Sequence, residues 1–436
     1  LPPGTYTIEA WHEVLGAKYG YDADTPVRIE VFKTWDDFSV RTIGFRGFTA
    51  LGACFGRVVT LDSPTARPPG QFSWTTTLWH EMAHVITLQM SNNRLPRWLS
   101  EGISVFEERR ARSDWGREME VPFAQALEEG KLLKLADLNE GFSDPRLISL
   151  TYYQASLVAD HLVSTYGEPA LWRLLRAYGQ GLETDEAFML AFGATIDEVR
   201  ESFDATLERD YAALRAALKT PSIPDEPTVD QLKAIAGDSP GSFAVQMRLA
   251  QALQQAGDSA AAIEALERAS RLVPAANGEA NPNTHIARIA IEQGDSARAI
   301  RALEAVVTVD SADVESARQL AALLEPAGDV ARTTAAYALV AELDPFDVRA
   351  QAAVGRRALE QRDAAVALRA FRSVISAAPA DRAAAHLDLG EAYLMAGRLA
   401  EAKREAVASL EIAPSFERAQ DLLLNTITAQ ADSAVP

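Results

Sequence analysis

Two histidines, His80 and His84, are the residues of this sequence best suited to chemistry. They flank Glu81 in the stretch HEMAH at residues 80–84, inside a segment that keeps helical apolar spacing from about Ser73 onward. Residues at i and i+4 share one face of a helix, so both imidazoles can reach a single Zn2+ at about 2.0–2.1 Å, with Glu81 beside them to hold a water molecule. The alternative is a pair of solvated or buried histidines that bind no metal.

A third candidate ligand, Glu101, lies on the next predicted helix. Pro96 starts a second helical segment, and Glu101 within it lies 17 residues after His84. An antiparallel helix of that reach can return Glu101 to the metal, which gives two histidines and one glutamate with the fourth position open to water. An open position predicts a catalytic zinc site rather than a structural one.

These stretches resemble the gluzincin metallopeptidases, in particular the bacterial peptidase MA-like domains related to thermolysin and aminopeptidase N. The likeness is carried by TLWHEMAHVITLQ, LPRWLSEGISVFEE and TYYQASLVADHLVSTYG, and it covers most of residues 1–219. The resemblance implies that the metal is zinc and that its ligands are His80, His84 and Glu101.

The resemblance also implies which residues handle the proton and the oxyanion. Glu81 is the expected general base, which takes a proton from the zinc-activated water and passes it to the leaving amine. In the aminopeptidase relatives a tyrosine that opens a later helix, in a Tyr-x-x-small pattern, binds the oxyanion. The stretch YQAS that begins at Tyr153 is similar, so Tyr153 is the first candidate for this role and Tyr152 the second.

Two departures from these relatives bear on the reaction. The aminopeptidases bind the free amine of the substrate through a Gly-Ala-Met-Glu-Asn strand, whereas the stretch GACFG at residues 52–56 has Phe55 in place of the carboxylate. This favours an endopeptidase that binds an extended peptide beside the strand over an aminopeptidase. Thermolysin-type enzymes orient a histidine with an aspartate four residues after the glutamate ligand, where this chain has Val105, so the orienting residues are left unassigned.

The elements that must position these residues follow an α+β pattern. The periodicity predicts a helix over 5–18, a strand over 26–32, a short helix over 35–41, a strand over 54–61 and mainly helices over 70–219. A small sheet followed by helices predicts a zincin-like α+β domain.

Composition changes near residue 220. All seven tryptophans precede it, and residues 220–227 (TPSIPDEP) contain three prolines, which prevent a helix from continuing. The predicted organisation is a zincin-like peptidase domain at 1–219, a proline-rich linker at 220–227, an all-α solenoid at 228–425 and a tail at 426–436.

The region after the linker repeats itself. Turn-like steps recur every 34–37 residues, at Gly257, Gly294, Gly328, Arg362 and Gly397. A period of this length with two helices per unit is typical of a solenoid, and an insertion at about 274–282 interrupts the early units. The alternative is an irregular alanine-rich helical bundle.

The last two units resemble tetratricopeptide repeats (TPR). The residues that carry this likeness are Gly355, Ala367, Phe371 and Pro379 in one unit and Leu389, Gly390, Tyr393, Ala402 and Pro414 in the next. The resemblance implies a superhelix whose concave face binds a peptide or a protein partner, although a fold alone assigns no partner.

Charge and composition disfavour several classes of protein. The 42 Lys and Arg against 61 Asp and Glu leave a net charge of -19, which repels phosphate, so we expect no nucleic-acid partner. The single cysteine, Cys54, excludes an intrachain disulfide and a cysteine-based metal cluster, and we expect it to be a small buried residue rather than a nucleophile. No stretch approaches the roughly 20 apolar residues of a membrane span.

The start of the chain bears on its location. It begins LPPG rather than with methionine, which is compatible with removal of a signal, an anchor or an upstream domain. By resemblance, bacterial proteins of this layout are often exported, which favours the periplasm or the cell surface.

The function predicted from these observations is a zinc-dependent endopeptidase whose repeats recruit a substrate or a protein partner. One alternative is an inactive zincin fold that serves as a TPR scaffold, and another is a zinc hydrolase that cleaves a different bond. We expect His161 to be a structural histidine rather than a transition-state group, and residues 107–110 (EERR) to form a solvated helical face.

Overall fold

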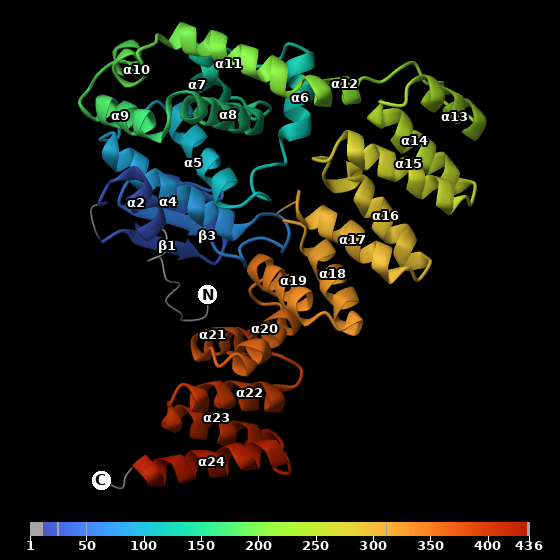
Figure 1. The fold of residues 1–436 in the computed structure, drawn as a ribbon. Coiled ribbons are helices and arrows are strands. Elements are labelled where there is room, and N and C mark those ends of the chain that lie inside the picture. Colours follow the sequence, from blue (N-terminus) through green and yellow to red (C-terminus); the bar gives the residue numbers. More distant parts are fainter. Residues whose placement is uncertain (1–11, 24–25, 49, 311, 434–436) are drawn as a thin grey trace. The chain divides into compact units, whose positions relative to one another are not determined.

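The computed structural model describes residues 12–23, 26–48, 50–310 and 312–433, and most of them are helical (Figure 1). The described chain divides into two compact units. Of the described residues, one unit contains those from His12 to Ala66 and from Ser73 to Asp313, and the other contains Arg67–Phe72 and those from Val314 to Ser433. None of the helices described combines the length and the apolar character that a membrane crossing requires.

The first compact unit begins with a small sheet and continues with helices. Its elements up to the proline-rich segment are η1 His12–Gly16, α2 Ala17–Tyr19, β1 Arg28–Phe32, α3 Trp35–Ile43, β2 Gly52–Cys54, β3 Val58–Asp62, α4 Trp74–Met90, α5 Arg97–Ala111, α6 Glu120–Glu128, η2 Leu135–Asp137, α7 Leu138–Gly141, α8 Ile148–Tyr166, α9 Glu168–Gly179, α10 Thr184–Phe192, α11 Ile196–Asp210 and α12 Ala212–Leu218. The predicted helices over 70–219 are confirmed. The helix predicted over 5–18 lies partly outside the described residues, of which the segment from His12 to Tyr19 is helical.

The sheet has the order β1-β3-β2, with β1 parallel and β2 antiparallel to β3, so β2 is an edge strand. The predicted strand over 26–32 and helix over 35–41 are confirmed by β1 and α3. The single strand predicted over 54–61 is wrong. The chain turns there, because Gly56 has a φ of +77° and the Phe55 N–H donates to the Val58 carbonyl at 2.8 Å, so the β-branched run belongs to β3 alone.

The helices that carry the candidate residues begin where the sequence predicts. Ser73 caps α4 by accepting a hydrogen bond from the Thr76 N–H at 3.3 Å, and Pro96 immediately precedes α5. Helix α5 packs between α4 and α8. It approaches α8 closely at Gly102, where an added Cβ would lie 2.5 Å from the Ala155 carbonyl oxygen. This close approach brings the start of α8 beside the candidate site.

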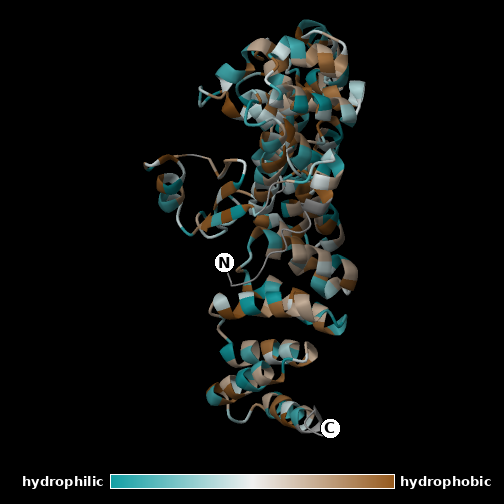
Figure 2. Ribbon diagram, turned by 90° about the vertical axis from the view of Figure 1, so that its left-hand side faces the viewer, coloured by the Kyte–Doolittle hydropathy of each residue, from teal (hydrophilic) through white to brown (hydrophobic). Residues whose placement is uncertain are grey.

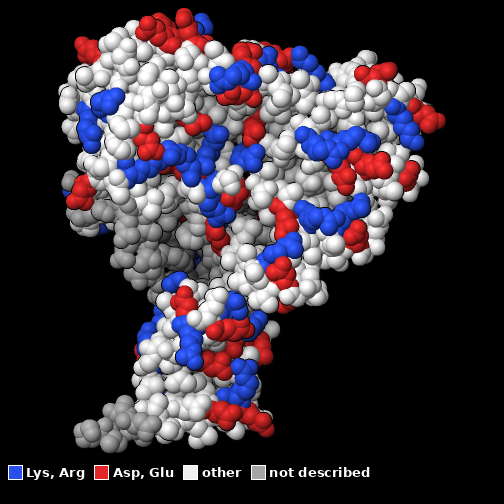
Figure 3. Space-filling view, viewed as in Figure 1, with Lys and Arg blue, Asp and Glu red and all other residues white. Residues whose placement is uncertain are grey.

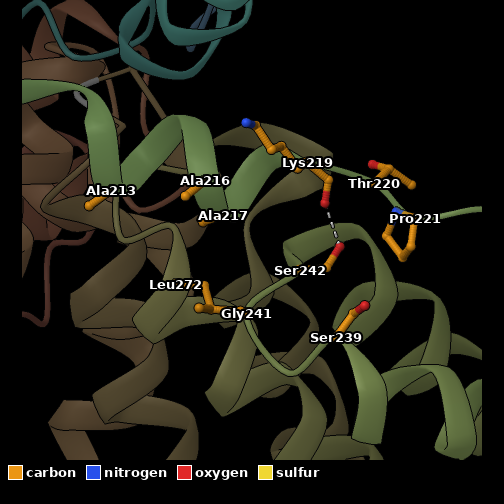
Figure 4. A pocket seen from close by; sticks show the side chains of 10 residues that line it. All are labelled: Ala213, Ala216, Ala217, Lys219, Thr220, Pro221, Ser239, Gly241, Ser242 and Leu272. Carbon is orange, nitrogen blue, oxygen red and sulfur yellow. Dashed lines mark hydrogen bonds between the residues drawn. The ribbon is translucent and has the colours of Figure 1, made fainter. Parts of the chain in front are cut away.

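The rest of the first unit consists of helix pairs. They are α13 Val229–Asp238, α14 Phe243–Gln255, α15 Ser259–Leu272, η3 Gly278–Ala280, α16 Pro282–Glu292 and α17 Ser296–Val307. They are joined to α12 by a cluster of buried Ala217, Val273 and Ala276. The Ser242 hydroxyl also donates to the Lys219 carbonyl at 2.8 Å, beside a cavity of about 510 Å3 walled largely by small side chains (Figure 4).

The second unit continues the helix pairs. Its helices are α18 Val314–Ala327, α19 Val330–Leu343, α20 Val348–Glu360, α21 Ala364–Ser376, α22 Arg382–Met395, α23 Leu399–Ile412 and α24 Glu417–Ser433. Figure 2 shows apolar and polar residues alternating along the helices before the C-terminus, as expected for helices that each bury one face. Helix α24 continues past residue 425, where the sequence predicts that the solenoid ends.

The predicted repeat turns are confirmed in both units. All five predicted turn residues have a positive φ: Gly257, Gly294, Gly328, Arg362 and Gly397. An aspartate follows each of the first four and caps the next helix, as Asp258 does by accepting from the Ala261 N–H at 3.1 Å. The TPR-like apolar residues form one buried cluster, which contains Ala367, Phe371, Leu389, Tyr393 and Ala402.

Candidate functional site

Three side chains converge where α4 packs on α5. The Nε2 atoms of His80 and His84 lie 3.1 Å apart, and Glu101 Oε2 lies 3.2 Å from the first and 3.1 Å from the second. The three atoms therefore form a nearly equilateral triangle. The two histidines share one face of α4, and Glu101 comes from the second turn of α5.

This triangle fits a zinc ion. Ligand atoms at about 2.0–2.1 Å from a tetrahedral zinc are separated from one another by roughly 3.3–3.4 Å, close to the observed spacing. The electrostatics agree. Burial by itself would lower the pKa of His80, but hydrogen bonds with Glu101 and Glu108 and the charge of Glu81 outweigh it and raise this pKa well above its ordinary value. A negative potential of this kind favours a cation at the triangle.

Two residues for which the sequence predicted no role at the site orient the imidazoles. Glu108 Oε1 lies 2.5 Å from His80 Nδ1, and Ser100 Oγ lies 3.0 Å from His84 Nδ1. We assign the proton of each ring to Nδ1, which leaves both Nε2 lone pairs directed at the triangle. Glu108 lies seven residues after Glu101 and so on the same face of α5, which is the signal in the sequence that points to it.

We expect Glu108→Gln to weaken zinc binding by about 10- to 100-fold, because the substituted amide no longer stabilises the Nδ1–H of His80 by charge. Competition with a chromophoric chelator measures this affinity. Glu107→Gln is the matched control, since Glu107 precedes Glu108 on the same helix but accepts hydrogen bonds from Lys18 and Tyr19 instead. Equal zinc affinity in the Glu108 variant and the wild type would remove Glu108 from the site.

Glu81 lies beside the triangle in a confined position. It is 5% exposed, and its Oε2 atom is buried without a hydrogen-bond partner among the described residues. Burial raises the pKa of the Glu81 carboxyl, and the negative charge of Glu101 raises it further. The charges of His80 and His84 lower this pKa but do not cancel the effect of burial. A buried carboxylate oxygen without a partner is suited to accept a hydrogen bond from a water molecule or a substrate.

The two candidate tyrosines point in different directions. The centroids of the Tyr152 and His80 rings lie 6.1 Å apart. Burial and the charge of the Glu101 carboxylate raise the pKa of the Tyr152 hydroxyl, whereas the charge of Arg97 and a hydrogen bond with it lower this pKa. The Tyr153 hydroxyl instead lies 3.0 Å from the Tyr211 hydroxyl, inside the apolar core. Of the two candidates, Tyr152 thus lies beside the triangle and Tyr153 belongs to the core, since successive helical residues differ in direction by about 100°.

The stretch at 107–110 is not the solvated face that the sequence predicts. Glu107 is 2% exposed and accepts hydrogen bonds from Lys18 Nζ at 2.6 Å and from the Tyr19 hydroxyl at 2.7 Å. This buried ion pair ties the chain before the sheet to α5, and Glu108 is bound to His80 as described above. Of the four residues, Arg110 alone is exposed.

His161 and Cys54 take part in packing. His161 is buried, its ring lies 5.7 Å from that of Phe203, and burial lowers its pKa. Burial and the neighbouring Glu81 charge raise the pKa of the Cys54 thiol to about 12, so the thiol stays protonated at neutral pH.

The edge strand β2 borders the site. A Cβ atom added at Gly52 would lie 2.7 Å from Glu81 Oε1, so the strand passes directly beside this carboxylate. Phe55, which directly follows β2, is 58% exposed. An extended chain that paired with β2 would therefore run past Glu81 and the triangle.

The comparisons with protein families agree with two parts of this architecture. Residues 15–209 match the model of the Peptidase MA superfamily, and residues 244–275 and 353–415 match models of the tetratricopeptide repeat. A Peptidase MA superfamily domain and tetratricopeptide repeats are therefore present. No curated protein matches the chain.

Several solved structures of repeat proteins are similar to parts of the chain. YrrB, titled a TPR protein with an unusual peptide-binding site, is 14% identical, with 44% of this chain and 98% of YrrB covered and a TM-score of 0.31. MamA from Desulfovibrio magneticus is 21% identical, with 36% and 99% covered and a TM-score of 0.27. The TPR domain of P58(IPK) is 15% identical, with 80% and 99% covered and a TM-score of 0.25.

Proposed function

We propose that this chain is a zinc-dependent peptidase that hydrolyses internal peptide bonds. The observation that supports it most is the convergence of His80 Nε2, His84 Nε2 and Glu101 Oε2 within 3.2 Å of one another. The match of residues 15–209 to the Peptidase MA superfamily supports the same reading. A zinc ion held at this point would polarise a substrate carbonyl and lower the pKa of a water molecule.

The residues around the triangle divide the remaining tasks. Glu81 accepts the proton of the attacking water through its unpartnered Oε2 atom and later delivers it to the leaving amine. Tyr152 donates a hydrogen bond to the oxyanion as it develops. Glu108 and Ser100 hold the imidazoles in the orientation that zinc binding requires.

The surroundings of β2 favour an endopeptidase. An aminopeptidase needs an anionic group for the free amine of its substrate, and Phe55 occupies the position where the aminopeptidase relatives have that carboxylate. A substrate strand paired with the edge of β2 would be held by main-chain hydrogen bonds and could extend beyond both sides of the scissile bond. The tetratricopeptide repeats would recruit the substrate or a protein partner.

Metal analysis tests the ligand set. We expect about one zinc per chain, and we expect His80→Ala and Glu101→Ala each to lose it, because removal of one of three protein ligands leaves the others with too few contacts. His386→Ala is a matched control, since His386 forms a His–Glu pair with Glu405 at 2.7 Å in the repeats. Stoichiometric zinc that survived both ligand substitutions would reject the proposal.

A further inference from the structure

Arg97 lies at the candidate zinc site but has no task in the proposed reaction. It is the first residue of α5, one turn before Glu101, and its side chain is 53% exposed. The groups assigned to the reaction are imidazoles, carboxylates and hydroxyls, to which Arg97 adds a guanidinium. An exposed cation at the border of a site that binds peptides is in a position to contact the substrate.

Three contacts hold this guanidinium in place. Arg97 Nε lies 3.5 Å from Glu101 Oε1, the carboxylate oxygen that is not part of the triangle. Arg97 Cζ lies 4.9 Å from the centroid of the Phe142 ring, and Arg97 also forms a hydrogen bond with the Tyr152 hydroxyl. The guanidinium is thus fixed before a substrate arrives, which lowers the entropic cost of binding.

These contacts leave several donors of Arg97 available. A guanidinium has five N–H groups, of which the contacts with Glu101 and Tyr152 use one each, and a ring contact needs none. Glu101 is the one carboxylate among the described residues that pairs with Arg97, and 3.5 Å is longer than the roughly 2.7–3.2 Å of an ordinary N–H···O hydrogen bond. The remaining N–H groups of this exposed side chain are therefore free to bind an anionic group.

The charge of the whole chain does not by itself attract such a group. The chain carries a net charge of -19, and Figure 3 shows acidic and basic side chains interspersed on the face that it draws. An acidic peptide is therefore repelled at long range. A preference for acidic peptides at the zinc site must come from a local contact, and Arg97 supplies one.

We infer that Arg97 binds a carboxylate of the substrate beside the scissile bond, so that peptides with an acidic residue there are the preferred substrates. This inference rests on the proposed function, since it concerns the same site. A guanidinium binds a carboxylate through two parallel charge-assisted hydrogen bonds. Because Arg97 contacts Tyr152, the proposed donor to the oxyanion, a carboxylate bound to Arg97 lies close to the reacting carbonyl. The carboxylate of an acidic side chain fits an endopeptidase, whereas that of a C-terminus fits a carboxypeptidase.

Fluorescence anisotropy with labelled peptides tests this inference on the full chain carrying Glu81→Gln, in which peptides are expected to stay intact. The probes are a short alanine peptide with a central glutamate and an amidated C-terminus, the same peptide with glutamine, and the glutamine peptide with a free C-terminus. We expect the glutamate peptide to bind about tenfold more tightly than the amidated glutamine peptide, and increasing salt to reduce this difference. Tighter binding of the peptide with the free C-terminus would support the same contact but assign the carboxylate to the end of the substrate.

Variants of Arg97 in the same background locate the contact. Arg97→Gln is expected to remove the preference for the glutamate peptide, and Arg97→Lys to keep part of it, because lysine keeps the charge without the two parallel hydrogen bonds. Arg209→Gln is the matched control and should keep the full preference, since Arg209 is an exposed arginine of α11 that pairs with Asp210 at 2.8 Å. Equal affinity for the three peptides, or a preference that survives Arg97→Gln, would overturn the inference.

Cleavage by the chain with Glu81 intact separates this inference from the proposed function. We expect kcat/KM for a quenched peptide with the central glutamate to be about tenfold higher than for the glutamine version. Cleavage of both at one rate, together with equal binding, would overturn the inference and leave the peptidase proposal standing. A binding preference that depends on Arg97, without any cleavage, would support the contact with Arg97 and reject the peptidase proposal.

Discussion

Glu81→Gln is expected to lower kcat/KM for a quenched peptide substrate by about 10²- to 10⁴-fold while the chain keeps its zinc and its fold. Glutamine has nearly the same shape as glutamate, so it fits the confined space beside Gly52. The amide, however, cannot accept a proton from the attacking water. The loss should therefore appear in kcat, with little change in KM, because proton transfer belongs to the transition state.

Zinc content and thermal unfolding separate a catalytic role of Glu81 from a structural one. Glu140→Gln, an exposed glutamate of the same domain, is the matched control and should keep the activity of the wild type. An undiminished rate in Glu81→Gln would show that another group is the base. Absence of cleavage by the wild type across a broad peptide library would instead favour a TPR scaffold with an inactive zincin fold.

The features of this fold that the sequence predicts well depend on local chemistry. Ser73 and Pro96 mark the starts of α4 and α5 because capping and the fixed φ of proline act within one turn. The same holds for the repeat turns, where a residue with positive φ precedes a capping aspartate. Since α4 and α5 are adjacent in the chain and pack on each other, the spacing of His80, His84 and Glu101 is enough to bring their side chains together.

The features that the sequence predicts poorly depend on contacts between distant segments. Glu107 resembles a solvated residue in the pattern EERR, and only its contact with Lys18, 89 positions earlier, makes its burial favourable. The stretch at 54–61 is not one strand because Gly56 adopts a positive φ and turns the chain. The β-branched residues that follow Gly56 favour a strand, so the sequence pattern does not indicate this turn. The choice between Tyr152 and Tyr153 also depends on a distant contact. Which of the two faces the site is decided by the rotation of α8 about its axis, and the packing of α8 on α5 at Gly102 sets this rotation.

Tyr152→Phe is expected to lower kcat by about 10²- to 10³-fold, because the variant loses a hydrogen-bond donor to the oxyanion while it keeps the ring that packs on Phe142. KM and zinc content should change little, since the hydroxyl acts mainly in the transition state. Steady-state kinetics with the same quenched peptide measures both constants.

Tyr153→Phe provides a control that differs from this variant by a single position. It removes the hydrogen bond with the Tyr211 hydroxyl, so it should lower the free energy of unfolding by about 1 kcal/mol without a comparable loss in kcat. The two variants thus separate a donor at the site from a hydroxyl in the core, although the sequence presents them as neighbours on one helix. If Tyr153→Phe lost activity and Tyr152→Phe did not, the oxyanion would have to be bound on the other side of α8, away from the ring of His80 that Tyr152 contacts.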